Sequence, residues 1–363
     1  MSAELDQKKK RNWISTLLKF VFFVLAFFLI TFTIMFNLGG SSDIYKETIE
    51  QYIAESTGLS ARIGQFNAMT FFPDLSLSFE DLELRRMPED IDPVAGADKI
   101  YLSFKFKDVA LGTGRVSDFY IENFYALPGI ILNKAIQIRT AGLSDLGAGA
   151  GLLKIEGHID QHKLEAQTNL QVLGSGDGKT YKFGKENNIS IALGPVHMEG
   201  IAKRKDTGSS LDNFKALFDG QEVLTGHFEI LSPPARDAHL RGEFLLSDHG
   251  TILKPDLQLA LKQPPLRVSG HFSSPVFYLE DVRYSSRLMK MTDFFEQVFG
   301  PPAESRKVDV DINFTAEKFY TKSGDTGTFE KKYEFSQVPW GMAPLKQFIA
   351  DFVQENEDRK SAP

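Results

Sequence analysis

The sequence lacks cysteine and an excess of positive charge, and each absence excludes a class of function. Without cysteine there are no disulfides, zinc–thiolate sites or thiol nucleophiles, so an exported domain must be held together by core packing. The 41 basic residues face 48 acidic ones, giving a formal net charge of −7. A nucleic-acid partner requires a basic face, so none is predicted. The 363 residues suffice for one large domain or two ordinary ones.

Tryptophan and tyrosine are also scarce, and phenylalanine takes their place. The chain has 2 Trp and 10 Tyr but 31 Phe, seven of which lie in one apolar segment near the N-terminus. Phenylalanine has no polar group, so this composition suits a protein that buries or contacts apolar material.

The apolar segment predicts one transmembrane helix. Between Trp13 and Leu38 the only charged residue is Lys19, and about 20 apolar residues in a helix span the hydrocarbon layer. Basic residues 8–11 precede the segment, so the positive-inside rule places the N-terminus in the cytoplasm and the rest of the chain across the membrane. A cleaved signal peptide is the alternative, but its apolar core is only ~7–15 residues and precedes an Ala-x-Ala-like site. The predicted organisation is a cytoplasmic head (1–12), an uncleaved anchor (13–38), a β-rich exported domain (39–355) and a charged flexible tail (356–363).

Alternation of apolar and polar residues predicts many short strands. The first clear runs cover residues 75–84, with a slip of phase at Asp81, and residues 100–106. Similar runs recur between residues 116 and 272, separated by turns rich in glycine and proline, and once more at 308–314. The predicted fold class is therefore mainly β: a long, curled, antiparallel meander sheet with a few short amphipathic helices.

Helical spacing of apolar residues occurs at three places. It covers residues 44–53, 288–299 and 345–353. Gly58 and Gly300 end the first two patterns, as glycine commonly does after a helix. We expect three short amphipathic helices on a sheet.

Residue types that could form a catalytic or metal site do not form a recognised motif. His158 and His162 are four residues apart, but around a strand end their side chains would not converge. Asp309, Asp311 and Asn313 imitate the start of a calcium loop, but their alternation with apolar residues marks them as the polar face of a strand. We predict a protein that is not an enzyme and holds no metal or cofactor. A polar site that only folding assembles, as in a membrane-tethered hydrolase, is the alternative.

Residues 50–125 resemble the start of AsmA-family proteins. The similarity lies in the stretches IAESTGLSARIGQFNAMTFFPDLSLSFEDLELRRMPE and AGADKIYLSFKFKDVALGTGRVSDFYIEN. In that family an N-terminal anchor leads into a short helix ending in Thr-Gly, then into a P-x-L-x-L strand, an A-D-K-hydrophobic segment and a G-x-hydrophobic strand. The corresponding residues here are Thr57-Gly58, Pro73 to Leu84, Ala97 to Ile100, and Gly114 to Ile121. The chain is shorter than the family's better-known members, and its middle shows no matching repeat.

The resemblance implies a protein of the Gram-negative inner membrane with its bulk in the periplasm. It also implies kinship to the TamB and bridge-like lipid-transfer group, in which the apolar face of a long curled sheet lines a groove for acyl chains. The candidate groove residues are Leu75, Leu77, Phe79, Ile100, Leu102, Phe104 and Phe106. A closed sandwich core gives the same alternation, and for a single residue such as Phe104 an ordinary core position is the default interpretation.

Two functions are compatible with this pattern. The first is a passive protein of envelope biogenesis that binds phospholipids or passes them along an apolar sheet. The second is an assembly factor that docks another envelope protein and influences outer-membrane assembly. A long exposed strand edge favours the second, because unpaired edges recruit strands, whereas a continuous apolar surface favours the first.

Overall fold

The computed structural model describes residues 42–70, 74–111, 115–174, 176–205, 207–231, 237–260, 266–300, 307–322, 324–339, 349, 352–354 and 356. The predicted anchor, residues 13–38, lies outside this part of the chain. Among the described helices none combines the length and the apolar composition that a membrane crossing requires.

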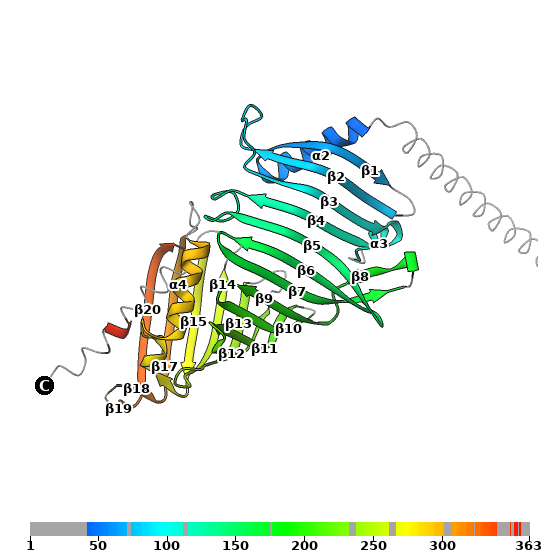
Figure 1. Ribbon diagram of the computed structural model, residues 1–363. Helices are drawn as coiled ribbons and strands as arrows, with labels where there is room; N and C mark the ends of the chain where they lie inside the picture. Colours follow the sequence, from blue (N-terminus) through cyan, green and yellow to red (C-terminus); the bar gives the residue numbers. More distant parts are fainter. Residues whose placement is uncertain are drawn as a thin grey trace, which may run out of the picture.

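One large antiparallel sheet makes up most of the molecule (Figure 1), as the sequence predicts. Its strands are β1 (Ser60–Thr70), β2 (Asp74–Arg85), β3 (Ala95–Lys105), β4 (Asp118–Ala126), β5 (Ile136–Gly147), β6 (Ala150–Ile159), β7 (His162–Leu173), β8 (Thr180–Lys182), β9 (Glu186–Leu193), β10 (Val196–Lys205), β11 (Gly208–Phe218), β12 (Gln221–Leu231), β13 (Ala238–Leu246), β14 (Ile252–Ala260), β15 (Leu266–Ser274), β17 (Lys307–Ala316) and β20 (Phe329–Pro339). Each strand pairs with the next along the chain, except that β7 pairs with both β8 and β9 and that β15 pairs in parallel with β17. Strands β16 (Phe277–Tyr278), β18 (Phe319–Thr321) and β19 (Gly324–Asp325) form a second, small sheet.

The register places the apolar side chains of successive strands on the same face. Ile155 of β6, for example, pairs with Ala141 of β5 and Ala166 of β7, and Ala166 pairs with Ile191 of β9. Residues paired across an antiparallel ladder point to the same side of a sheet. The large sheet therefore has one continuous apolar face from β1 to β20.

Irregular residues inside the strands keep that face continuous. Asp81, Asn123 and Asn213 adopt positive φ angles of 56°, 49° and 50°. Each lies between two apolar residues that are three positions apart, such as Phe79 and Leu82. In a regular strand two such residues would point to opposite faces. Asp and Asn tolerate this conformation best among non-glycine residues. The slip of phase predicted at Asp81 is thus confirmed as a local irregularity within β2.

The opposite face carries charged side chains in cross-strand ion pairs, and we call it the charged face. Arg139 of β5 and Lys154 of β6 both reach Glu156, each at 2.5 Å. Asp311 of β17 contacts Arg267 of β15 at 2.9 Å and Lys332 of β20 at 3.2 Å. The prediction that Asp311 belongs to the polar face of a strand is confirmed.

The helices α2, α3 and α4 lie against or beside this sheet. Helix α2 (Ser42–Thr57) lies along β1, α3 (Phe106–Ala110) follows β3, and α4 (Arg287–Phe299) connects the two parallel strands β15 and β17. We call the strand ends at which β3, β5 and β7 begin the α4 rim, and the opposite strand ends the α3 rim.

Helix α2 begins the described chain and covers one edge of the sheet. Its Ile49 and Ile53 pack against a cluster that contains Ile63 and Phe79. Glu50 accepts a hydrogen bond of 2.6 Å from the backbone N–H of Ile63, a residue of edge strand β1. The helix thus protects an edge that would otherwise be open to pairing. Tyr52, which the helical pattern includes among the apolar positions, is instead 71% exposed.

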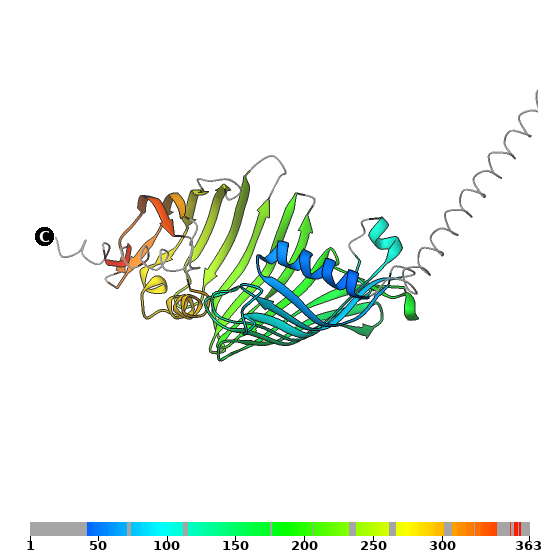
Figure 2. The same ribbon diagram turned by 90° about the horizontal axis from the view of Figure 1, so that it is seen from above.

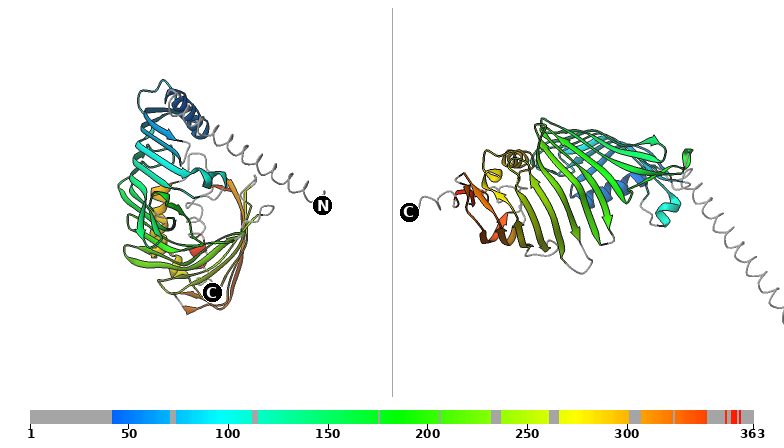
Figure 3. Two further views of the ribbon diagram at one scale, coloured as in Figure 1. Left: turned by 90° about the vertical axis from the view of Figure 1, so that its right-hand side faces the viewer. Right: turned by 90° about the horizontal axis from the view of Figure 1, so that it is seen from below.

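Helix α4 lies on the apolar face along the α4 rim. Its Phe294 packs with Leu193 of β9 and Val196 of β10, at the turns between strands. Ser286 caps its first turn by accepting a hydrogen bond of 3.2 Å from the backbone N–H of Met289, and the helix ends before Gly300, as predicted. Figure 3 shows the sheet end-on as a curled layer with α4 on the inside of the curve.

The C-terminal residues that are described pack onto the last strands. Phe352 is buried in a cluster with Phe277, Phe314 and Phe329. Asn356, which the sequence assigns to the flexible tail, is buried and donates a hydrogen bond of 2.8 Å to the carbonyl of Phe352. The packed part of the chain therefore extends past the predicted boundary at residue 355, because the polar side chain satisfies a helix carbonyl.

Glycines within the strands allow neighbouring strands to approach closely. A Cβ at Gly157 of β6 would lie 2.1 Å from the carbonyl oxygen of Gln137 in β5, and one at Gly270 of β15 would lie 2.2 Å from the carbonyl oxygen of Asp256 in β14. Both contacts are with backbone, which cannot move aside without disturbing the ladder. Glycine at such positions is a common cause of curvature in sheets.

We therefore expect Gly157→Ala to lower the free energy of unfolding by about 2 kcal/mol, the typical cost of an overpacked interior. Urea denaturation of the purified protein measures this as a lower midpoint with an unchanged slope. Gly178→Ala is the matched control, because a Cβ there meets no atom within 4 Å. Equal midpoints for the two variants would contradict the role given to Gly157.

Candidate functional site

The structure places six of the seven predicted groove residues together on the apolar face. Strands β2 and β3 pair Leu75 with Phe104, Leu77 with Leu102, and Phe79 with Ile100. Phe79 is 3% exposed and belongs to the core beneath α2, and Leu77 and Ile100 pack against that core. Leu75, Leu102 and Phe104 are half-buried and lie outside it.

Phe106, the seventh candidate, does not lie on the strand. Strand β3 ends at Lys105, and Phe106 is the first residue of α3, where it is 40% exposed. The backbone N–H of Leu111 bonds to the carbonyl of Lys107 at 3.0 Å, so this segment forms local rather than cross-strand hydrogen bonds. Its Asp108 is buried and lies 3.5 Å from Arg115. This helical turn ends the strand at Lys105, although the apolar–polar alternation of the sequence continues through residue 106.

A larger set of half-buried apolar side chains continues from Leu75 and Phe104 across the apolar face. They lie between α4 and the α3 rim, outside the buried clusters of the described residues, and we call them the apolar row. Its members are Leu75, Leu102, Phe104, Phe119, Ile121, Leu143, Leu153, Ile155, Ile189, Ile191, Leu211, Phe228 and Ile230. Among the described elements, α2 covers one end of this face and α4 covers one rim (Figure 2).

The sequence pattern misses two members of the row, Leu143 and Leu211, because their strands are irregular. Strand β5 contains a register irregularity after Ile138 and a glycine at 142, and β11 contains the positive-φ residue Asn213. Each interrupts the simple alternation that marks a strand. A sequence signal for such a strand irregularity is an Asp or Asn between two apolar residues that are three positions apart, as in Leu211-Asp-Asn-Phe214.

The apolar row is long compared with one acyl chain. It crosses ten strands from β2 to β12 in the described sheet, and at ~4.8 Å between strands this is roughly 40 Å. One leaflet of a bilayer is about 15 Å of hydrocarbon, half of the ~30 Å core. The row consists of aliphatic and phenylalanine side chains, which suit an apolar chain and offer no donor or acceptor to it.

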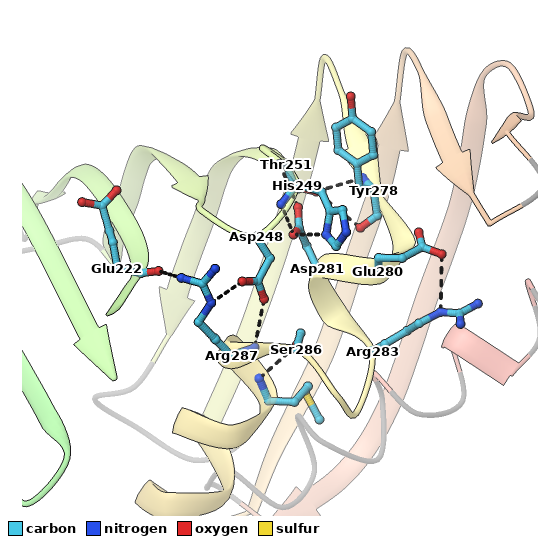
Figure 4. A network of polar contacts seen from close by, with 11 residues as sticks. Glu222, Asp248, His249, Thr251, Tyr278, Glu280, Asp281, Arg283, Ser286 and Arg287 are labelled. Atoms are coloured by element: carbon cyan, nitrogen blue, oxygen red, sulfur yellow. Dashed lines mark hydrogen bonds and ion pairs between the residues drawn. The ribbon is translucent and has the colours of Figure 1, made fainter. Parts of the chain in front are cut away.

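The main buried polar cluster joins α4 to the sheet (Figure 4). Asp281 is 1% exposed and accepts hydrogen bonds from the backbone N–H groups of His249 at 2.7 Å and Thr251 at 2.9 Å, with the imidazole Nδ1 of His249 3.0 Å away. Arg287 at the start of α4 donates from its backbone to Asp248 at 2.9 Å and from its guanidinium to the carbonyl of Glu222 at 2.7 Å. The Arg287 contacts fasten the start of α4 to Asp248 and Glu222, and the Asp281 contacts fasten the segment just before α4 to the turn between β13 and β14.

A histidine, an aspartate and the nearby Ser286 invite comparison with a catalytic triad. The hydroxyl of Ser286 accepts from the backbone N–H of Met289, and Ser286 is buried. Asp281 is occupied by two backbone N–H groups besides the imidazole. Each member thus has a structural role, and we attribute the cluster to the attachment of α4.

His158 and His162, the two histidines four residues apart, lie on opposite faces of the sheet. His158 pairs with Lys163 on the charged face, whereas His162 pairs with Ile159 on the apolar face and packs edge-on against Phe294, with ring centroids 4.9 Å apart. The prediction that His158 and His162 do not converge is confirmed. No group of three metal-ligating side chains occurs within the described residues.

Comparison of the chain with protein-family models, with curated proteins and with solved structures gives no match.

Removal of the Asp281 carboxylate is expected to destabilise the protein. Asp281→Ala leaves the buried backbone N–H of Thr251 and the part-buried backbone N–H of His249 without their acceptor, which costs about 2–4 kcal/mol. His249→Ala is the control, because it removes a half-exposed ring and keeps the backbone N–H. Urea denaturation should separate the two variants clearly. A cost for His249→Ala as large as that for Asp281→Ala would contradict the structural role of the carboxylate.

Glu156 on the charged face is expected to titrate at a lower pH than an ordinary glutamate. Hydrogen bonds from Lys154 and Arg139 hold the pKa of Glu156 at about 2, below its ordinary value of 4.5. Because the folded pKa is lowered, this ion pair contributes its full stabilisation above about pH 4.5 and loses it as the pH falls toward 2. In the double variant Lys154→Gln with Arg139→Gln the pKa should return toward 4.5. Carbon-13 NMR of glutamate-labelled protein measures the titration, and an unchanged pKa in that variant would refute the assignment.

Proposed function

We propose that this protein binds the acyl chains of membrane phospholipids along its apolar row, as a non-enzymatic, membrane-anchored protein of the cell envelope. The observation that carries the proposal is the apolar face itself. It continues across the whole large sheet, and its middle is formed by half-buried aliphatic and aromatic side chains rather than by a second packed layer of described elements. Large apolar surfaces of this kind typically mark sites of interaction with ligands, proteins or membranes.

The predicted anchor and the resemblance to AsmA-family proteins support the cellular setting. A helix at residues 13–38 would hold the domain at the inner membrane with its bulk in the periplasm, close to a supply of phospholipid. The row would shield acyl chains from water while the headgroups stay in solvent. Transfer along it would be passive, with direction set by a gradient or by a partner protein.

The assembly-factor alternative has weaker support. It requires a strand edge that is open for pairing, and the edge at β1 is covered by α2 through Glu50 and the backbone of Ile63. The other terminal strand, β20, carries several lysine and glutamate residues. Such charges on a terminal strand oppose edge-to-edge pairing.

Site-specific photo-crosslinking tests the lipid proposal in the full-length chain. The photoreactive residue p-benzoylphenylalanine replaces Ile155 or Phe228 of the apolar row in cells whose phospholipids are labelled with phosphorus-32. We expect a labelled protein band after irradiation, because an acyl chain would lie against these side chains.

Neighbouring residues on the charged face provide the matched controls. Lys154 and His227 precede the two test positions in the same strands and point to the opposite face. They should give no lipid adduct. Adducts of equal yield at both faces, or none at Ile155 and Phe228, would overturn the proposal and favour a protein partner on the apolar face.

A further inference from the structure

Large apolar side chains are exposed to solvent at the α3 rim. In and just after α3, Val109 and Leu111 are 47% and 76% exposed. Leu146, before the β5–β6 turn, is 63% exposed, and Phe183, after β8, is 61% exposed. Like Phe106, these side chains lie outside the buried clusters of the described residues. Each Å² of apolar surface that they expose to water is unfavourable by about 25 cal/mol.

Backbone and ionic contacts hold these segments next to one another. Val116, which follows α3, exchanges backbone hydrogen bonds of 2.9 and 2.6 Å with Tyr181 of β8. Lys179, just before β8, forms an ion pair with Asp145 of β5, and the backbone N–H of Val172 donates to the carbonyl of the turn residue Gly149 at 2.9 Å. The exposed apolar groups therefore belong to one surface rather than to separate loops.

The position of α2 indicates what lies against this surface. Figures 1 and 2 both show the first turn of α2 on the side of the molecule where α3 and β8 lie. The predicted anchor ends at Leu38, and only residues 39–41 separate it from Ser42, the first residue of α2. At ~3.5 Å per residue this connection spans at most about 14 Å, so the membrane surface must lie close to the start of α2.

The basic residues of the rim fit the surface of a bilayer. Lys107 and Lys185 are exposed and Lys182 is half-buried, and none of the three forms an ion pair within the described part of the chain. Lysines next to apolar side chains can keep their ammonium groups among lipid phosphates while the apolar groups enter the layer below. A neighbouring acidic group, Asp74, is paired with Lys105 at 2.7 Å.

We propose that the α3 rim is a second membrane contact, in which Phe106, Val109, Leu111, Leu146 and Phe183 lie at the boundary between headgroups and acyl chains of the bilayer that holds the anchor. The inference rests on the predicted anchor, and it deepens the proposed function. Phe104 of the apolar row is two residues from α3, so this contact would bring one end of the row to the leaflet from which acyl chains are drawn.

The absence of cysteine allows a direct test with the full-length protein. Single-cysteine variants Leu111→Cys, Leu146→Cys and Phe183→Cys are labelled with the environment-sensitive dye NBD and reconstituted into vesicles of phosphatidylethanolamine and phosphatidylglycerol. We expect blue-shifted emission and strong quenching when the vesicles contain doxyl-labelled lipids, because the dyes would lie within the bilayer interface.

The α4 rim offers matched controls. Ile91 and Ile131 are 86% and 58% exposed there, and a strand of ten residues at ~3.3 Å per residue places them about 30 Å from the α3 rim. Their cysteine variants should show aqueous emission and several-fold weaker quenching. Quenching that is equal at both rims, or absent at Leu111, Leu146 and Phe183, would overturn the proposal.

A second variant separates membrane contact from lipid binding on the sheet. Lys107→Glu with Lys182→Glu should reduce quenching at Leu146, since repulsion by anionic lipid would lift the rim, with circular dichroism showing the fold retained. Unchanged quenching in this variant would contradict the role of the lysines. Crosslinking at Ile155 without quenching at the rim would refute the membrane contact alone, whereas quenching without crosslinking would refute the proposed function alone.

Discussion

The structure depends on one constraint: apolar side chains must stay on the same face of a sheet through many consecutive strands. The side-chain period of a strand is two, so a shift of one residue in any strand would turn its apolar side chains to the opposite face. Positive φ angles at Asp81, Asn123 and Asn213 absorb such shifts where the apolar residues are three apart. Without these irregularities the apolar face would be broken in β2, β4 and β11.

The two faces of the sheet then differ in chemistry and in how they are completed. The charged face is finished by ion pairs such as those around Glu156 and Asp311 and needs no further layer. The apolar face is covered by α2 at one end and by α4 along one rim. The polar cluster around Asp281 holds the start of α4 at that rim, so α4 does not cover the apolar row. Placement of one helix therefore decides how much apolar surface is left for a ligand.

The regular strands could be predicted from the sequence, and the irregular ones could not. Alternation identifies β2, β3 and β17 because each reads as a plain apolar–polar repeat, and it correctly assigns Leu75 and Phe104 to one face. It fails at Phe106, where a helical turn with local hydrogen bonds replaces the strand while the letters still alternate. It also fails in β5 and β11, where a register irregularity or a positive φ angle hides the repeat. These failures arise because alternation measures spacing and not backbone conformation.

By itself the sequence determined the mainly β class, the amphipathic patterns at residues 44–53 and 288–299 that lie within α2 and α4, and the chemical character of the two faces, because side-chain periodicity is a local property. Only the tertiary structure decided which apolar residues become core and which stay half-buried. That outcome depends on where a distant helix packs: Leu193 is buried because Phe294 of α4 lies on it, whereas Ile191, two residues earlier in the same strand, is left in the apolar row. Local spacing cannot encode a contact between residues a hundred positions apart.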